Sequence, residues 1–203
     1  MAEVAMFKPG PLPVGPTRRQ GVGWWGAIML VASEGALFAY LLFGYFYVGA
    51  TEPPGWVLEP RPDLRLALPN TVLLLLSSVA AWFGEHGVLS RRRGRALLGF
   101  GLAAVMGVVF AAVQWKEWHL KHFLPGTSSY ASLYYATTAF HMAHVVIGIA
   151  VLLGIFLWTA LDYFSPRRHM AVSAGVLYWH FVDAVWLAVF TTYYLTPYLG
   201  FGT

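Results

Sequence analysis

Cysteine is absent from the 203 residues of this chain, and charged residues are scarce at 11%. Without cysteine, a disulfide framework, a thiolate-bound copper centre and a cysteine-ligated iron–sulfur cluster are all excluded. Soluble domains carry about a quarter charged residues, so the scarcity of charge also argues against a soluble protein. Hydrophobic residues make up 58% of the chain, and the mean hydropathy is +0.60. We therefore expect an integral membrane protein.

Basic residues give the chain a formal net charge of +4 and a pI near 9.4. They lie between the apolar runs and are not interleaved with aromatic residues, which excludes the pattern of a nucleic-acid-binding face. Most of them fall in connections that would share one side of the membrane: Lys8, Arg18, Arg19, Arg91, Arg92, Arg93, Arg95, Arg167 and Arg168. Because Lys and Arg accumulate on the cytoplasmic side, we predict a cytoplasmic N-terminus and an outside C-terminus.

Five apolar runs are long enough to cross a hydrocarbon core of about 30 Å, which takes roughly 20 helical residues. They cover residues 22–48, 66–89, 94–118, 130–158 and 171–196. Lipid offers no partner to unpaired backbone groups, so each run must be helical. The sequence predicts an all-α membrane bundle of five transmembrane helices in one domain, residues 22–203, after a proline-rich cytoplasmic arm, residues 1–21. No internal repeat is evident.

Aromatic residues near the ends of these runs are expected at the two membrane interfaces, where Trp and Tyr are enriched. They are Trp24, Trp25, Trp115, Trp118, Tyr130, Tyr193 and Tyr194.

Ionisable residues inside the runs are the candidates for function, because each costs about 2.5 kcal/mol or more in lipid unless it is paired. They are Glu34, His141, His144, His180 and Asp183. A helical rise of about 1.5 Å per residue places all of them near one depth. The residues of the fourth and fifth runs each lie on one helix face, and two polar faces at one depth should meet. We predict a buried polar cluster in which Glu34 and Asp183 hydrogen-bond with some of the histidines.

This predicted cluster has several interpretations. It joins helices by hydrogen bonds worth about 1 kcal/mol each, or it serves as a proton or ligand site. Histidines and carboxylates are also metal ligands, and opposed histidines such as His141 and His180 suit a haem. Pairing of neutral imidazoles with polar neighbours explains the residues equally well.

Polar residues at or near the helix ends form three further groups. Gln114 and Glu117 are three positions apart and are expected to make an interfacial hydrogen-bonding pair that faces a neighbouring subunit. The arginines Arg91, Arg92, Arg93 and Arg95 are expected to fix topology and to contact anionic lipid head groups. His119, Lys121 and His122 are expected in a solvated loop.

Several motifs, taken in order, resemble subunit III of the haem-copper terminal oxidases, the group of the cytochrome c oxidases and quinol oxidases. They are Ala32-Ser33-Glu34 with Phe38-Ala39, 70-NTVLLLLSS-78, Gln114 with Glu117, 140-FHMAHVVIG-148 and 178-YWHFVDAVW-186. By this resemblance Glu34 is the family's buried helix carboxylate, and His141 with His144 is its histidine pair. His180 and Asp183 belong to its Tyr-Trp-His-Phe-Val-Asp motif.

The resemblance implies a non-catalytic subunit of a proton-pumping complex that reduces O2 to water. Such a subunit binds no metal itself: haems and copper are expected in the partner subunits, and structural phospholipids between the helices. The expected partners are catalytic subunit I, subunit II, a subunit IV and membrane lipids, with no nucleic acid and no soluble small-molecule substrate. Its expected roles are to stabilise subunit I and to support proton uptake. The five-helix length resembles the short bacterial form, which implies the bacterial cytoplasmic membrane.

Other assignments share some of these features. A quinol oxidase subunit III and an accessory protein of nitric oxide reductase belong to the same superfamily. From the residues alone, a haem-binding membrane cytochrome and a small proton-coupled transporter also stay open, although the sequence lacks the broken helix pair or inverted repeat of many transporters.

Overall fold

The structure is a computed structural model that describes residues 22–59 and 61–202, so the predicted arm of residues 1–21 lies outside the described residues. The helices are α1 (Val22–Thr51), α2 (Leu64–Leu89), α3 (Arg93–Leu120), α4 (Ser129–Ala160) and α5 (Met170–Phe190). All five are long and apolar enough to cross a membrane, and the described residues form no β-strand. The prediction of an all-α bundle with five transmembrane helices is confirmed.

The fifth helix departs from its predicted form after Phe190. A π-helical turn (Thr191–Leu195) and a 3-10 turn (Thr196–Leu199) follow α5, and Pro197 lies in the second of them. The predicted span of residues 171–196 is helical throughout, but its last part is π-helical and not α-helical. The apolar pattern does not distinguish a π-helical turn from an α-helical one.

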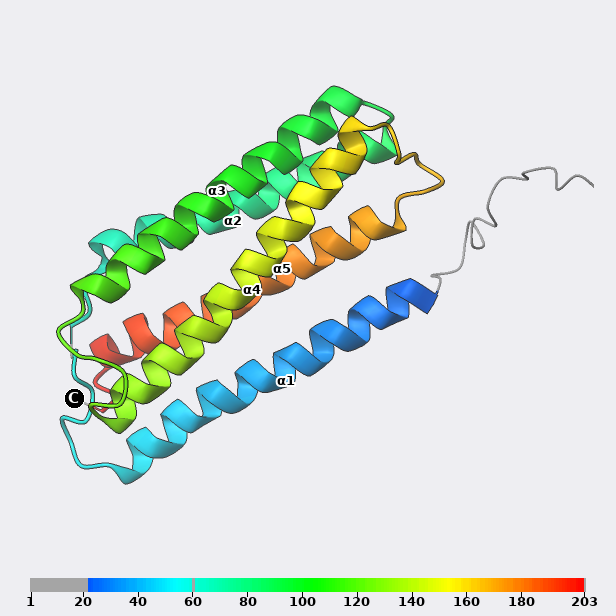
Figure 1. The fold of residues 1–203 in the computed structure, drawn as a ribbon. Helices are drawn as coiled ribbons and strands as arrows, with labels where there is room; N and C mark the ends of the chain where they lie inside the picture. Colours follow the sequence, from blue (N-terminus) through cyan, green and yellow to red (C-terminus); the bar gives the residue numbers. More distant parts are fainter. Residues whose placement is uncertain (1–21, 60, 203) are drawn as a thin grey trace, which may run out of the picture.

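The helices are arranged with α4 and α5 between α1 on one side and α2 with α3 on the other (Figure 1). Helices α2 and α3 make the most extensive contact, whereas α1 packs mainly on α4 and α5. Helix α1 buries only Phe38 and Tyr45 along its 30 residues. The remaining α1 surface is left for lipid or for another protein.

Glycines and alanines bring α2 and α3 close together. A Cβ added at Gly99 would lie 2.5 Å from the Cα of Gly84, so the two backbones pass each other at a distance that only glycine permits. Gly87 faces the backbone of Ala96 in the same way. Such small residues are the usual means of close helix packing in membranes, where apolar burial does not favour protein over lipid.

Charged residues separate toward the two ends of the bundle. The end at which α2 meets α3 and α4 meets α5 carries Arg91, Arg92, Arg93, Arg95, Arg167 and Arg168, and we call it the arginine end. The opposite end, with the C-terminus, is called the C-terminal end (Figure 1).

The aromatic residues divide into two groups. Trp25 and Trp115 are 54% and 60% exposed, as interfacial residues would be. Tyr130, Tyr193 and Tyr194 are each 1% exposed, and they belong to the core. Placing these tyrosines at the membrane interface was wrong, because position along a helix does not show which face a side chain occupies.

Candidate functional site

Glu34 of α1 and His144 of α4 meet in the middle of the spans. The His144 Nε2 lies 3.1 Å from the Glu34 Oε2, with the side chains 10% and 31% exposed. The His144 Nδ1 lies 2.7 Å from the carbonyl oxygen of Phe140 and must donate to it, since a carbonyl only accepts. The Glu34–His144 contact then needs one further proton, carried either by the imidazole or by the carboxyl group. The pair is therefore a single-proton site.

His141 is held in a separate aromatic environment between α4 and α5. Its Nε2 donates to the Val182 carbonyl oxygen at 3.2 Å, and its side chain is buried. The ring packs against Trp186 and Phe110, with centroids 4.9 and 5.9 Å away. This histidine therefore links two helices.

Side-chain hydrogen bonds join α2 to α5 along most of their length. From the arginine end onward, they are Ser173 Oγ to Glu85 Oε1 (2.5 Å), His180 Nδ1 with Ser78 Oγ (2.9 Å), Trp179 Nε1 to Ser77 Oγ (2.9 Å) and Trp186 Nε1 to Thr71 Oγ1 (2.9 Å). The helices are antiparallel, so these pairs recur about every two turns. Asp183 is buried on this side, and neither of its oxygens has a hydrogen-bond partner among the described residues.

The predicted cluster of Glu34, His141, His144, His180 and Asp183 does not form one hydrogen-bonded group. Glu34 and His144 bond to each other, but His141 bonds to the Val182 backbone and His180 to Ser78. Asp183 bonds to none of the histidines in the described chain. Within the residues described, no three His, Asp or Glu side chains come together in a way that would hold a metal ion.

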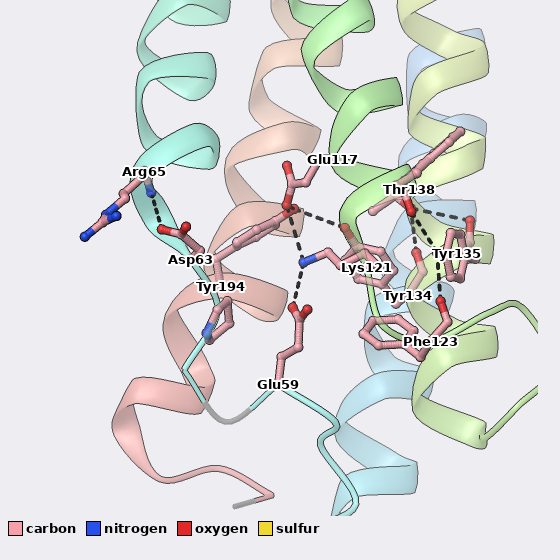
Figure 2. A network of polar contacts seen from close by, with 12 residues as sticks. Glu59, Asp63, Arg65, Glu117, Lys121, Phe123, Tyr134, Tyr135, Thr138 and Tyr194 are labelled. Carbon is pink, nitrogen blue, oxygen red and sulfur yellow. Dashed lines mark hydrogen bonds and ion pairs between the residues drawn. The ribbon is translucent and has the colours of Figure 1, made fainter.

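A second polar site lies at the C-terminal end, and of its residues only Glu117 was predicted to make a polar contact (Figure 2). Lys121 Nζ lies 2.6 Å from Glu59 Oε2 and 3.4 Å from Glu117 Oε1, although Lys121 and Glu117 side chains are each only 7% exposed. Tyr194 donates to Glu117, and its hydroxyl lies 3.2 Å from that of Tyr134. This network, which we call the Lys121 network, ties the α1–α2 connection to α3, α4 and the π-helical turn.

Two consecutive tyrosines of the π-helical turn both point into the bundle. Tyr193 contacts Thr137 at 3.0 Å between hydroxyl oxygens, while Tyr194 reaches Glu117. Neighbouring residues of an α-helix point about 100° apart, which follows from 3.6 residues per turn. In the π-helical turn, Thr192, Tyr193 and Tyr194 are all buried.

Gln114 and Glu117 were expected to face a neighbouring subunit, and the structure places them differently. They are 1% and 5% exposed within this chain, which does not fit a pair that faces a neighbouring subunit. Glu117 belongs to the Lys121 network, and neither amide atom of Gln114 has a partner among the described residues. Lys121, expected in a solvated loop, has a side chain that is only 7% exposed. The spacing of four residues between Glu117 and Lys121 could have predicted their ion pair. Glu59 is too distant in sequence for spacing to predict its contact with Lys121.

The arginines at the other end occupy different environments. Arg93 donates to the carbonyl oxygen of Ala160, and the Arg95 guanidinium lies 4.5 Å from the centroid of the Phe83 ring. Arg91 and Arg92 are exposed. Arg93 and Arg95 therefore also contribute to packing between helices.

Replacement of Thr71 by valine should lower the free energy of unfolding by about 1 kcal/mol, because the buried Trp186 indole N–H then loses its acceptor. Thr159→Val is the matched control, since the buried Thr159 hydroxyl donates only to the carbonyl of Ile155 on its own helix. Thermal unfolding of the purified chain in detergent measures both. Equal losses in the two variants would contradict a stabilising α2–α5 bond.

The sequence of this chain is similar to those of known proteins. A model of the cytochrome c oxidase subunit III family matches residues 16–198. The chain belongs to the cytochrome c oxidase subunit III family. As a member of that family it is a multi-pass membrane protein, and the family's description as a subunit implies a multi-subunit complex.

Individual relatives agree with this assignment. A protein of Pyricularia grisea called cytochrome c oxidase subunit 3 is 34% identical over 178 residues, which cover 83% of this chain and 65% of that protein. The proteins of that name from Synechocystis and Gallus gallus are 34% and 31% identical, covering 84% and 88% of this chain and 74% and 71% of their own lengths. The chain thus spans slightly less than two thirds of the fungal relative and somewhat more of the other two.

Proposed function

We propose that this chain is a non-catalytic subunit III of a proton-pumping haem-copper terminal oxidase that reduces O2 to water. In this proposal it stabilises catalytic subunit I, supports proton uptake and holds phospholipid. The main support is that polar side chains in the middle of the spans bond to groups on other helices of the same chain, as those of Glu34, His141 and His180 do. Such bonds make a rigid bundle suited to bracing a partner.

The haems and copper of the complex are assigned to the partner subunits. This chain has no cysteine for a thiolate copper centre. His141, His144 and His180 each use a ring nitrogen on a partner within the chain. We assign the metals to subunits I and II and include subunit IV among the partners.

The proposed placement is the bacterial cytoplasmic membrane, with the arginine end on the cytoplasmic side. The concentration of arginines at that end supports this orientation. Support of proton uptake rests on the single-proton site of Glu34 and His144, because ionisable pairs in the middle of membrane spans are typical of proton relays.

An oxidase complex prepared without this chain should keep its haem absorption spectrum and its copper, but should inactivate after fewer turnovers. The physical reason is that a bracing subunit stabilises its partner without supplying a reacting group. Oxygen consumption followed to inactivation, together with mass spectrometry of the co-purifying subunits, makes the measurement.

Two results would contradict the proposal. One is a complex without this chain that turns over at the full rate for as long as the complete complex. The other is the absence of a large haem-bearing protein from the material that co-purifies with this chain. The identity of that protein also separates a cytochrome c oxidase from a quinol oxidase or a nitric oxide reductase.

A further inference from the structure

Gln114 of α3 is 1% exposed, and neither polar atom of its amide group has a hydrogen-bond partner among the described residues. It lies on a buried face of α3, since Phe110, Gln114 and Glu117 follow the spacing of one helix face. Its neighbours on that face contact the fifth helix and its continuation. The Phe110 and Trp186 ring centroids are 4.9 Å apart, and Glu117 accepts from Tyr194. The Gln114 amide therefore points into the bundle.

Asn70 of α2 lies directly beside the backbone of Gln114. Its Nδ2 donates to the carbonyl oxygen of Phe110 at 3.2 Å. In an α-helix this carbonyl also accepts from the N–H of the residue four positions later, which is Gln114. Asn70 is 4% exposed, and its Oδ1 has no partner in the described part of the chain. Two buried amide side chains from facing helices are thus adjacent, and most of their polar atoms are unpaired.

Glu117 extends this group toward the C-terminal end (Figure 2). Its Oε1 accepts from Tyr194 and lies 3.4 Å from Lys121 Nζ, whereas its Oε2 has no partner within the residues described. The unpaired atoms of Asn70, Gln114 and Glu117 are therefore three oxygen acceptors and one amide nitrogen. That nitrogen carries two N–H donors, so no pairing inside the group can satisfy every acceptor. Additional donors must come from a ligand.

The chemistry of the group points to water as this ligand. Buried polar groups are costly when unpaired, and a buried water typically makes about three hydrogen bonds to such groups. A metal cation would satisfy the oxygens but would be repelled by the N–H groups of Gln114. A larger ligand would have to reach side chains that are only 1% and 4% exposed. On α2, the side chain one turn from Asn70 toward Gln114 is Ala67, whose methyl group is small.

We propose that Asn70, Gln114 and Glu117 form a buried water-binding site between α2 and α3. The water accepts from the Gln114 amide nitrogen and donates to the free oxygens of Asn70 and Glu117. It thereby hydrates the side of the Glu117 carboxylate that faces away from Lys121, which lowers the cost of burying that charge. This site goes beyond the proposed oxidase function and does not depend on it.

X-ray radiolytic labelling of the purified full chain in detergent tests the site in the native protein. Hydroxyl radicals form in place from bound water and oxidise the side chains next to it, and mass spectrometry of peptides locates the oxidation. Phe110 and Phe100 form a matched pair, because both lie on α3 and both are 0% exposed. Phe110 adjoins the proposed site, whereas the Phe100 ring lies against Gly84 in the α2–α3 contact. Phe110 should be oxidised and Phe100 protected.

Replacement of Gln114 by methionine gives a second readout, because methionine keeps the side-chain length but removes the amide group. With water bound, Gln114→Met should reduce the oxidation of Phe110 and lower the folded-to-unfolded ratio about fivefold, the effect of one hydrogen bond. Without water, the substitution should raise this ratio, since an unpaired buried polar group is removed. Lys116→Met, at an exposed position of the same helix, controls for the introduction of methionine.

Equal oxidation of Phe110 and Phe100 in the native chain would overturn the inference, whether both are oxidised or both are protected. A Gln114→Met chain that is more stable than the native chain would also overturn it, as would unchanged oxidation of Phe110 in that variant. The comparison of the two phenylalanines needs no substitution, so it decides the question even if the variant does not fold. The oxidase assignment is tested separately by the haem-bearing partner, whose absence would leave the oxidation of Phe110 unaffected.

Discussion

Replacement of Lys121 by methionine is expected to lower the free energy of unfolding by about 3–5 kcal/mol, the cost of breaking a buried ion pair by removing one partner. Methionine keeps much of the side-chain volume but leaves Glu117 buried near Glu59 without the positive charge between them. Thermal or denaturant-induced unfolding of the purified chain in detergent measures the loss.

Lys116→Met is the control for Lys121→Met, because Lys116 lies near the end of α3, five residues before Lys121, and is exposed. It should unfold like the native chain. The double variant Lys121→Met with Glu117→Gln should recover part of the loss, since the uncompensated buried charge is then removed. A Lys121→Met protein that unfolds together with the Lys116→Met control would show that the network does not stabilise the fold.

Replacement of Gly99 by alanine is expected to cost about 1–3 kcal/mol, as extra methyl groups do in closely packed cores. The new Cβ would lie 2.5 Å from the Cα of Gly84, so two helix backbones must separate rather than one flexible side chain move. Because α2 and α3 make the most extensive contact in the bundle, the separation affects a large part of the packing.

Gly154→Ala provides the matched control for Gly99→Ala. A Cβ at Gly154 meets nothing within 4 Å, and alanine is favoured over glycine in helices by about 1 kcal/mol. Unfolding measured in the same detergent should show a loss for Gly99→Ala and no loss for Gly154→Ala. Losses of similar size would place the effect in the helices themselves and not in the α2–α3 contact.

The helices were predictable because lipid permits few alternatives. In lipid, an apolar run of membrane length can satisfy its backbone groups only as a helix. Four of the helices begin at Leu64, Arg93, Ser129 and Met170, within one or two residues of the predicted starts at 66, 94, 130 and 171. The exception is the end of the fifth helix, where the apolar pattern does not reveal that residues 191–195 form a π-helical turn.

The site was predictable only in part. The sequence gives the depth of a polar side chain in the membrane, but it does not give the helix that this side chain contacts. Helical rise gave a common depth for Glu34 and His144, and these two do meet. The helix that a polar face contacts depends on how the helices are arranged in the bundle. A single sequence does not contain that arrangement. His180 therefore bonds to Ser78 of α2 rather than to a histidine of α4. Lys121 was missed because Glu59 comes from a loop far away in the sequence.

The outer position of α1 affects the order in which the helices unfold. Its side-chain hydrogen bonds to other helices in the described structure come from Glu34 and Tyr45, the latter to Thr196 at 2.9 Å. Helices α2 to α5, by contrast, are joined by close backbone contact and by the α2–α5 bonds. Local opening follows the least connected element, so α1 should exchange its amide hydrogens first, while α2 to α5 unfold later as one cooperative unit.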